Sequence, residues 1–398
     1  MTAVTLPIDG FADTLPAMLA DLAALVTCES PSADLAAVAA GAEQVARLGT
    51  RSLGTEPEVL VLAGCTHLRW RLGTGPRRLL LLCHQDTVWP LGTLATIPWS
   101  VTDGVVRGPG CFDMKAGIVL AFTVLSRLQA AGTDLDGVTV LVTGDEEIGS
   151  PTSADLIRAE ATGCRAVLVL EASADGGALK TGRKGASLYE LAVTGRAAHA
   201  GLEPEKGVSS TIELAHQVLA VAALADPAHG TTVTPTVLTS GTTTNTVPAA
   251  GTLGVDVRAL TAAEQQRVDA GMRALTPVLP GARLELRGGI NRPPLEEASS
   301  AALFALAGTV SAGLGLPAPV GVTVGGASDG NFTAGIGVPT LDGLGAVGGG
   351  AHAAGEHVLA AELPGRAALL AGLVTAVLAD GDGAGVGVGV PDEEPDGE

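Results

Sequence analysis

The stretch Val140-Leu-Val-Thr-Gly-Asp-Glu-Glu-Ile-Gly-Ser150 places two adjacent carboxylates directly after an apolar, β-branched run. The run predicts a buried strand, with Glu146 and Glu147 at its carboxyl end. Two neighbouring carboxylates that leave water together are unfavourable, because each loses hydration beside a like charge. A bound cation would remove this penalty. The stretch therefore indicates a metal site at the end of a strand.

Two further apolar runs, residues 78–83 and 166–170, also predict buried strands. Between the strands, residues 116–131 and 154–161 have the apolar spacing of helices, and Gly132 suits the C-terminal end of the first. Strands that alternate with helices predict an α/β fold. We expect a largely parallel sheet flanked by helices.

The pattern changes after residue 180 to the order βαββαβ. Strands are predicted at 186–193, 233–239, 252–260 and 283–287, and helices at 204–224 and 261–279. Thr261 and Glu264 form a capping box at the start of the second helix. This order is typical of a ferredoxin-like, four-stranded sheet with two helices, so we expect an inserted domain.

The insertion divides the chain. We expect a first catalytic part at 1–180, the inserted domain at 181–292, a second catalytic part at 293–380 with a helix at 299–310, and an acidic tail at 381–398. The tail is rich in Gly, Pro and carboxylates and has no Lys or Arg, which predicts disorder.

Composition limits the partners. The formal net charge of -19 argues against nucleic acid and anionic membranes. We expect no membrane span and no secretory signal, since Met1 to Gly10 lacks a basic segment followed by an apolar core. The cysteines are scattered and odd in number, as in a protein with reduced thiols, and Cys83 and Cys111 are interpreted as buried apolar residues rather than ligands. These features predict a cytoplasmic protein.

Candidate ligands follow the predicted strands at their carboxyl ends, where ligands collect in parallel-sheet proteins. They are His84, Asp86, Glu146, Glu147 and Glu171. Asp113 and His352 lie in Gly-rich loops, a setting that favours His352 over His357. Each signal alone also fits a surface charge, a turn or a core imidazole. Their combination predicts a site for zinc or a similar ion.

The motifs that carry these residues resemble those of a known family. They are His84-Gln-Asp-Thr-Val-Trp-Pro90, Arg107-Gly-Pro-Gly-Cys-Phe-Asp-Met-Lys115, Thr143-Gly-Asp-Glu-Glu-Ile-Gly-Ser150, Arg196-Ala-Ala-His-Ala-Gly201 and Gly350-Ala-His352. In this order they are similar to the di-zinc exopeptidases and deacylases that include glutamate carboxypeptidase, acetylornithine deacetylase and succinyl-diaminopimelate desuccinylase. The resemblance covers nearly the whole chain apart from the tail. Ala116, where the family often has Gly, is one departure.

The resemblance implies a pair of zinc ions, for which Co²⁺ or Mn²⁺ can substitute. Asp113 would bridge the two ions. His84 and Glu171 would complete one site, and Glu147 and His352 the other. Glu at position 171, where the aminopeptidase branch tends to carry Asp, favours the carboxypeptidase and deacylase branch.

The resemblance also implies catalytic roles. Glu146 would be the general base, and Asp86 would orient His84 through its other ring nitrogen. His199, in the inserted domain, would stabilise the oxyanion in the partner subunit, which implies a homodimer. The inserted domain would then serve as a dimerisation or lid domain.

Substrate binding in an acidic chain is expected to use fixed polar and cationic groups. By resemblance, Asn245 and Arg258 would hold a substrate carboxylate, and Arg292 is a further candidate. We therefore expect a zinc-dependent hydrolase that cleaves an amide bond in a peptide or N-acyl amino acid with a free carboxylate. The alternatives are an aminopeptidase or dipeptidase of the same family, and a non-catalytic binding protein with the same fold.

Overall fold

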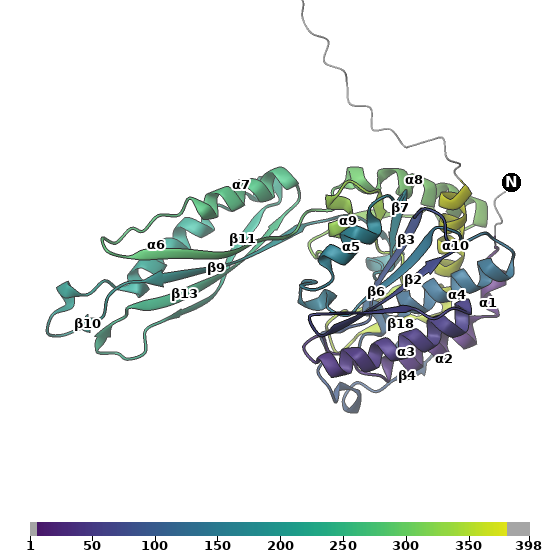
Figure 1. Ribbon diagram of the computed structural model, residues 1–398, viewed down its shortest axis with the longest axis horizontal. Helices are drawn as coiled ribbons and strands as arrows, with labels where there is room; N and C mark the ends of the chain where they lie inside the picture. Colours follow the sequence, from purple (N-terminus) through teal and green to yellow (C-terminus); the bar gives the residue numbers. More distant parts are fainter. Residues whose placement is uncertain (1–5, 380–398) are drawn as a thin grey trace, which may run out of the picture.

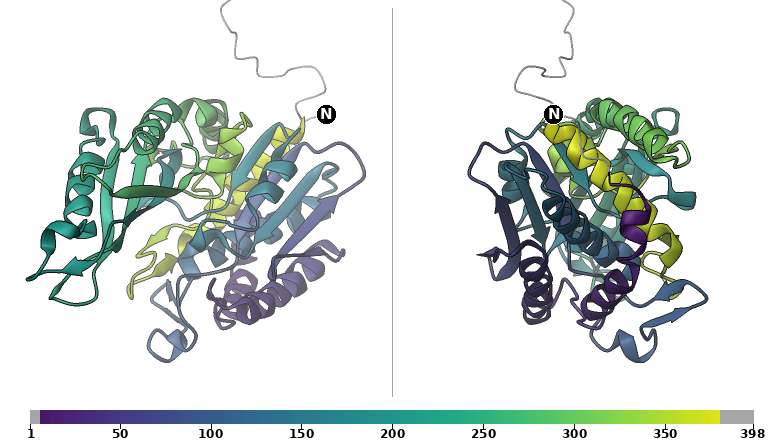
Figure 2. Two further views of the ribbon diagram at one scale, coloured as in Figure 1. Left: turned by 60° about the vertical axis from the view of Figure 1, so that its left-hand side comes forward. Right: turned by 90° about the vertical axis from the view of Figure 1, so that its right-hand side faces the viewer.

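The computed structural model describes residues 6–379, which form a body and a long arm (Figures 1 and 2). The predicted tail lies outside these residues. The body is built on a six-stranded sheet in the order β1-β2-β6-β3-β7-β16. Its strands are β1 (Glu58–Leu62), β2 (Cys65–Leu72), β6 (Val138–Thr143), β3 (Leu79–His84), β7 (Ala166–Val169) and β16 (Thr340–Leu341). The last four are parallel, which confirms the α/β prediction.

The central strands are apolar throughout because both faces of the sheet are covered. In β3, Leu79 and Leu81 face a large core formed with helices α3 (Leu35–Leu53), α4 (Ala116–Ala130) and α10 (Leu363–Ala379). Leu80 and Leu82 face a smaller core with α5 (Ala154–Ala161) and α9 (Gly330–Gly335). Each of these fully buried leucines contributes about 1.5–3 kcal/mol to folding. A continuous apolar strand is therefore the expected sequence at this position.

The hairpin of β1 and β2 was absent from the sequence prediction. Its strands are antiparallel and meet at a turn where Ala63 and Gly64 both have positive φ. Leu68 and Trp70 of β2 are buried, but the polar residues that precede, separate and follow them obscure the apolar pattern of a strand. Short helices α1 (Asp9–Ala12) and α2 (Leu15–Val26) precede this hairpin and pack on the large core.

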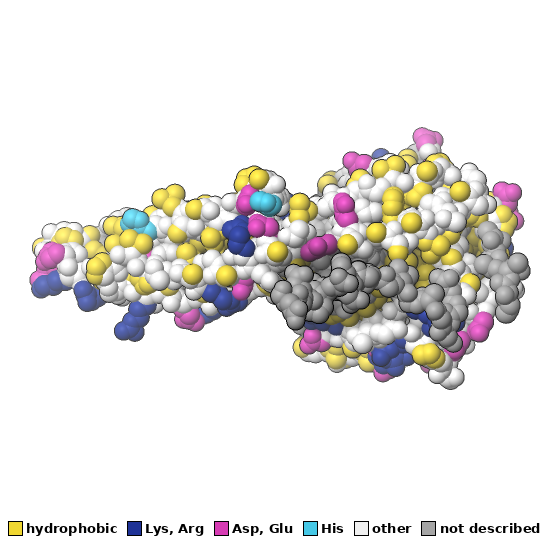
Figure 3. Space-filling view, turned by 90° about the horizontal axis from the view of Figure 1, so that it is seen from above, with side chains coloured by type: hydrophobic (Ala, Val, Ile, Leu, Met, Phe, Trp, Pro, Cys, Tyr) yellow, Lys and Arg dark blue, Asp and Glu magenta, His cyan; other side chains and the backbone are white. Residues whose placement is uncertain are grey.

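The arm is a four-stranded antiparallel sheet in the order β11-β13-β9-β14. Its strands are β9 (Gly185–Thr194), β11 (Thr232–Ser240), β13 (Ala250–Ala259) and β14 (Arg283–Arg292), and its helices are α6 (Ser210–Ala222) and α7 (Ala262–Arg273). Both helices pack against the sheet over an apolar core of their own. This is the predicted βαββαβ order. On the face shown in Figure 3, basic, acidic and apolar side chains are interspersed along the arm.

Three element bounds in the arm differ from the prediction. Residues 204–206 form a separate 3-10 turn, and α6 begins only after Ser209, whose side chain caps Ile212 N. Helix α7 ends at Arg273 rather than near 279, since the residue before Pro277 disfavours helical geometry. Strand β14 continues to Arg292 through an irregularity in register.

The body continues slightly beyond the predicted boundary at 180. Strand β8 (Leu179–Arg183) pairs with β15 (Gly321–Val324) of the body, and the chain enters the arm immediately afterwards, at Gly185. After the arm, α8 (Glu297–Leu314) packs against β8 and β16.

Two helices correct the expectation that no segment is long and apolar enough to span a membrane. Length and composition would allow two helices to span a membrane, Glu297–Leu314 and Ala360–Ala379. The second is 67% buried in the body. The first buries Ser300, Leu303 and Ala307, one face of the helix, and its outer face is rich in Ala and Gly. The second is therefore mostly a core helix of the body, whereas only 22% of the first is buried.

Candidate metal centre

The parallel strands deliver three of the predicted segments to one edge of the sheet. Strand β3 ends at His84, which is paired in register with Thr143 at the end of β6. After β6 the chain forms a 3-10 turn at Glu146–Ile148, and Glu171 follows β7. Because the carboxyl ends of parallel strands share an edge, these side chains converge.

A small sheet brings the remaining candidates to the same edge. It contains β17 (Gly348–Gly349), β18 (His357–Leu359), β5 (Val105–Arg107) and β4 (Ser100–Thr102). Asp113 follows β5, and His352 lies in the loop between β17 and β18. His352 has a φ of 60°, in the left-handed region that non-glycine residues rarely adopt. Local backbone strain therefore accompanies its orientation.

Asp113 lies between two imidazoles. Its Oδ1 is 3.4 Å from His84 Nε2, and its Oδ2 is 3.3 Å from His352 Nε2. Glu171 Oε1 lies 3.3 Å from His84 Nε2. Glu147 Oε2 lies 3.1 Å from His352 Nε2. The side chains thus form two groups that share one carboxylate.

These separations fit metal coordination. His84 Nε2 is buried and makes no hydrogen bond to the described part of the chain, although two carboxylate oxygens lie 3.3 and 3.4 Å away. Ligands bound to a tetrahedral zinc ion at about 2.0–2.1 Å lie about 3.3 Å from one another. The two groups have both the spacing and the ligand chemistry for a pair of divalent cations.

The carboxylates also shift the protonation of the imidazoles. Hydrogen bonds with Asp113 and Glu147 raise the pKa of His352 to about 10. Burial by itself would lower the pKa of His84, but its carboxylate neighbours, Asp113 foremost, raise it well above the usual value. Without cations, the neighbouring carboxylates therefore favour the protonated form of both imidazoles. Metal binding would release these protons.

Glu146 is buried beside these groups, with ligand atoms near those of His84 and Glu171. Burial raises the pKa of Glu146 well above its usual range, and the positive charge of Arg292 opposes this shift. A carboxyl group with a raised pKa is suited both to accept a proton and to return it. The position and environment of Glu146 match those of a general base.

The structure corrects the expectation for Arg292. This side chain was a candidate for binding the substrate carboxylate, but it is only 7% exposed and lies behind Glu146. Its guanidinium is 2.9 Å from Glu146 Oε1 and donates to Ser150 Oγ at 2.7 Å and Asp329 Oδ1 at 3.1 Å. A guanidinium with these partners is an internal counter-ion of the candidate base.

Asp86 contacts the ring nitrogen of His84 that does not face Asp113 and Glu171. His84 Nδ1 lies 3.4 Å from Asp86 Oδ1 and 3.0 Å from its backbone oxygen. The same carboxylate accepts hydrogen bonds from the backbone N of Glu146 and of Glu147. Asp86 therefore orients one candidate ligand and fixes the turn that carries two other functional side chains.

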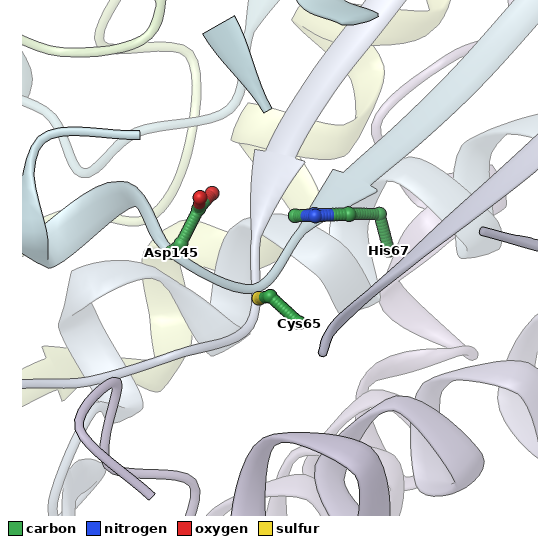
Figure 4. A group of neighbouring side chains, drawn as sticks. All are labelled: Cys65, His67 and Asp145. Atoms are coloured by element: carbon green, nitrogen blue, oxygen red, sulfur yellow. The ribbon is translucent and has the colours of Figure 1, made fainter. Parts of the chain in front are cut away.

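A second cluster lies behind the same turn. Cys65, His67 and Asp145 are buried, and Figure 4 shows them gathered around one space. His67 Nδ1 accepts from Gly144 N at 3.2 Å, which leaves Nε2–H to donate to Thr152 Oγ1 at 2.9 Å. Thr152 Oγ1 in turn donates to Asp145 Oδ2 at 2.7 Å. Because both ring nitrogens have partners, this cluster is a structural support of the turn.

The predicted residues of the arm do not join the metal centre of the single chain. His199 belongs to β10 (Ala198–His199), which pairs with β12 (Thr246–Val247) at the tip of the arm (Figure 1). Asn245 is exposed next to it. Arg258 lies at the body end of β13, where its guanidinium forms two hydrogen bonds with Asp256.

The prediction missed three buried charged residues near the site. Glu356 accepts hydrogen bonds from Gly110 N, Phe112 N and Asp113 N and from Trp89 Nε1, so it fixes the loop that carries Asp113. Arg183 lies 3.4 Å from Glu171 Oε2. Asp329 accepts from Thr143 Oγ1 and Arg292. Their partners are distant in sequence, so no local motif marks them.

Known proteins are similar to this chain in sequence and in fold. The model of peptidase family M20/M25/M40 matches residues 80–376. The chain belongs to this family of metallopeptidases. Carboxypeptidase G2 from Pseudomonas sp. strain RS-16 is 32% identical over 377 residues, which cover 91% of this chain and 89% of that protein.

Two further comparisons agree with this assignment to family M20. A succinyl-diaminopimelate desuccinylase from Dechloromonas aromatica is 28% identical, with coverage of 79% of this chain and 87% of the relative. The crystal structure of the M20 family metallo-carboxypeptidase Sso-CP2 from Sulfolobus solfataricus superimposes with a TM-score of 0.70 at 15% identity, covering 90% of this chain and 99% of that chain. This likeness shows a shared fold.

Proposed function

We propose that this M20 protein is a two-metal hydrolase that cleaves the amide bond of a peptide or N-acyl amino acid with a free carboxylate. The observation that supports it most is Asp113, with one carboxylate oxygen toward His84 and the other toward His352. Two divalent cations, Zn²⁺ or alternatively Co²⁺ or Mn²⁺, would supply Lewis acidity and make water nucleophilic near neutral pH.

The protein's own residues would handle the proton. Glu146 accepts a proton from the attacking water and delivers it to the leaving nitrogen. Arg292 remains beside Glu146 and offsets part of the penalty of burying its negative charge. Asp86 keeps His84 in one orientation during the reaction.

The arm would complete the site in a homodimer. His199 and Asn245 are exposed at the tip of the arm, away from the metal centre of their own subunit. We assign His199 as an oxyanion donor to the partner's site. Asn245 at the arm tip of one subunit and Arg258 at the body end of the other subunit's arm would bind the substrate carboxylate. The acidic chain and its reduced cysteines favour a cytoplasmic protein that acts on small molecules.

The carboxypeptidase and the desuccinylase among the relatives both fit this proposal, and two alternatives lie outside it. An aminopeptidase or dipeptidase would require a free amine on the substrate, and a non-catalytic protein would bind substrates without turnover. The test is hydrolysis by metal-loaded protein of a panel of dipeptides and N-acetyl amino acids, with Glu146→Ala as control. Full activity in Glu146→Ala would disprove the assigned base.

A further inference from the structure

A cavity of about 490 Å³ opens beside Glu147, and segments of the body line it. Its apolar lining includes Val88, Pro90, Leu91 and Ile148. Val88, Leu91 and Ile148 are 42, 56 and 55% exposed, although large apolar side chains normally leave water. Exposed apolar side chains gathered in one concave place are typical of a binding site.

The charges in this cavity have one sign. Its charged lining residues are Asp34 and Glu147, and the lining contains no Lys or Arg among the residues that the structure describes. Asp34 also accepts hydrogen bonds from Ala36 N and Ala37 N at the start of α3. An anionic group in the cavity would lose its hydration without gaining a cationic partner. A neutral apolar group would be favoured there.

The walls of the cavity are held in place through Asp86. Its Oδ2 accepts hydrogen bonds from Ser32 Oγ at 2.6 Å and from Glu147 N at 3.1 Å. The segments on either side are also joined by backbone hydrogen bonds between Ser32 N and Thr87 O and between Thr87 N and Ser30 O. The cavity is therefore preformed, and its position relative to the metal centre is fixed.

We propose that this cavity is the acyl subsite of the enzyme, and that it selects uncharged, apolar acyl groups over anionic ones such as succinyl. The inference rests on the proposed function, which assigns the substrate carboxylate to Asn245 and Arg258 of the arm. The acyl side of the substrate then extends toward the body. Glu147, which belongs to both the metal centre and the cavity lining, connects the scissile bond to this subsite.

The test compares two acyl groups of the same shape. N-(4-methylpentanoyl) and N-succinyl derivatives of one amino acid differ mainly in whether the group ends in an isopropyl or a carboxylate. On the amino acid whose N-acetyl derivative is cleaved fastest, we expect kcat/KM for the apolar probe to exceed that for succinyl by about tenfold or more. Equal values, or a preference for succinyl, would overturn the proposal.

A pair of variants shows whether the cavity causes the preference. Leu91→Lys places a cation at the lining, so the ratio of the two kcat/KM values should fall about fivefold or more. Val61→Lys introduces the same change at an exposed position of β1, 61% accessible and outside the cavity, and should leave the ratio unchanged. An unchanged ratio in Leu91→Lys would also overturn the proposal.

Failure of the proposed function is distinguishable from failure of the subsite. If no N-acyl amino acid is cleaved, the proposed function fails. Calorimetric binding of the same two probes to wild type and Leu91→Lys then still tests whether the cavity binds apolar acyl groups. Tighter binding of the 4-methylpentanoyl probe by wild type, lost in Leu91→Lys, would support the subsite. Equal binding of both probes, or no binding of either, would reject it.

Discussion

The guanidinium of Arg292 lies 2.9 Å from the carboxylate of Glu146, and both side chains are buried. Arg292 ends β14, the last strand of the arm, so the arm contributes the counter-ion of the candidate base in the body. This contact couples the junction of the two parts to the chemistry of the site.

Replacing Arg292 should therefore affect both stability and the pH profile. Arg292→Met leaves the buried carboxylates of Glu146 and Asp329 without their cation, and we expect a loss of about 3 kcal/mol in the free energy of unfolding. Arg292 lowers the pKa of Glu146, so its removal should move the acidic limb of the kcat/KM profile to higher pH. Urea denaturation and a pH series measure these effects. Arg287→Met, at an exposed arginine of the same strand, is the control; equal behaviour of the two variants would contradict this role.

Glu356 should control metal affinity without being a ligand. Its carboxylate accepts the backbone N–H groups of Gly110, Phe112 and Asp113. Glu356→Gln converts an acceptor-only group into one with an N–H donor that faces these donors, so the Asp113 loop should lose its fixed geometry. We expect the affinity for Zn²⁺ to fall about 10- to 100-fold in a competition assay with a chelator. The control variant Glu362→Gln, at an exposed residue, should bind Zn²⁺ with wild-type affinity. Wild-type Zn²⁺ affinity in Glu356→Gln would disprove the role of Glu356 in holding the Asp113 loop.

The metal-free protein should lose stability as pH rises. The pKa of His352 is raised from 6.5 to about 10 by hydrogen bonds with Asp113 and Glu147. A raised folded-state pKa stabilises the protein fully below pH 6.5, and this contribution disappears as pH rises toward 10. In chelator-treated protein, His352→Asn should therefore flatten the decrease in unfolding free energy over this range. The same slope in wild type and variant would show that His352 carries no such proton.

Complementation between inactive subunits tests the role of His199. If His199 acts in the partner's site, His199→Ala and Glu146→Ala homodimers are both inactive. A mixed dimer regains one complete site, because the Glu146→Ala subunit supplies His199 to the other. Unfolding and refolding an equal mixture should then restore about a quarter of wild-type activity, since half the dimers are mixed and each has one working site. No recovery, with dimers present by light scattering, would exclude an exchange of His199 between subunits.

The sequence was most informative where local patterns and chemistry coincide. Strands β3, β6 and β7 are continuous apolar runs because both of their faces are buried, and the candidate ligands follow each strand directly. The arm was predictable for the same reason, since its elements have clear periodicity and a separate core.

The features that could not be predicted from the sequence depend on contacts between residues that are distant in the chain. Arg292 and Glu356 are charged residues in loops or at strand ends, and their sequence neighbours suggest exposure. Both are buried because segments distant in sequence supply their partners. Arg292 forms ion pairs with Glu146 and Asp329, and Glu356 accepts hydrogen bonds from the backbone of the 110–113 loop. The β1–β2 hairpin was missed because polar residues interrupt the apolar positions of β2.

The central claim is that Asp113 joins two cations in one centre. Elemental analysis of wild type and Asp113→Asn, after loading with Zn²⁺ and removal of free ions, tests it most directly, with circular dichroism to verify folding. We predict two bound ions per chain in wild type and loss of both in the folded variant, because each ion loses a ligand to the same substitution. A folded Asp113→Asn protein that retains two ions, or a wild-type protein that binds none, would contradict the account.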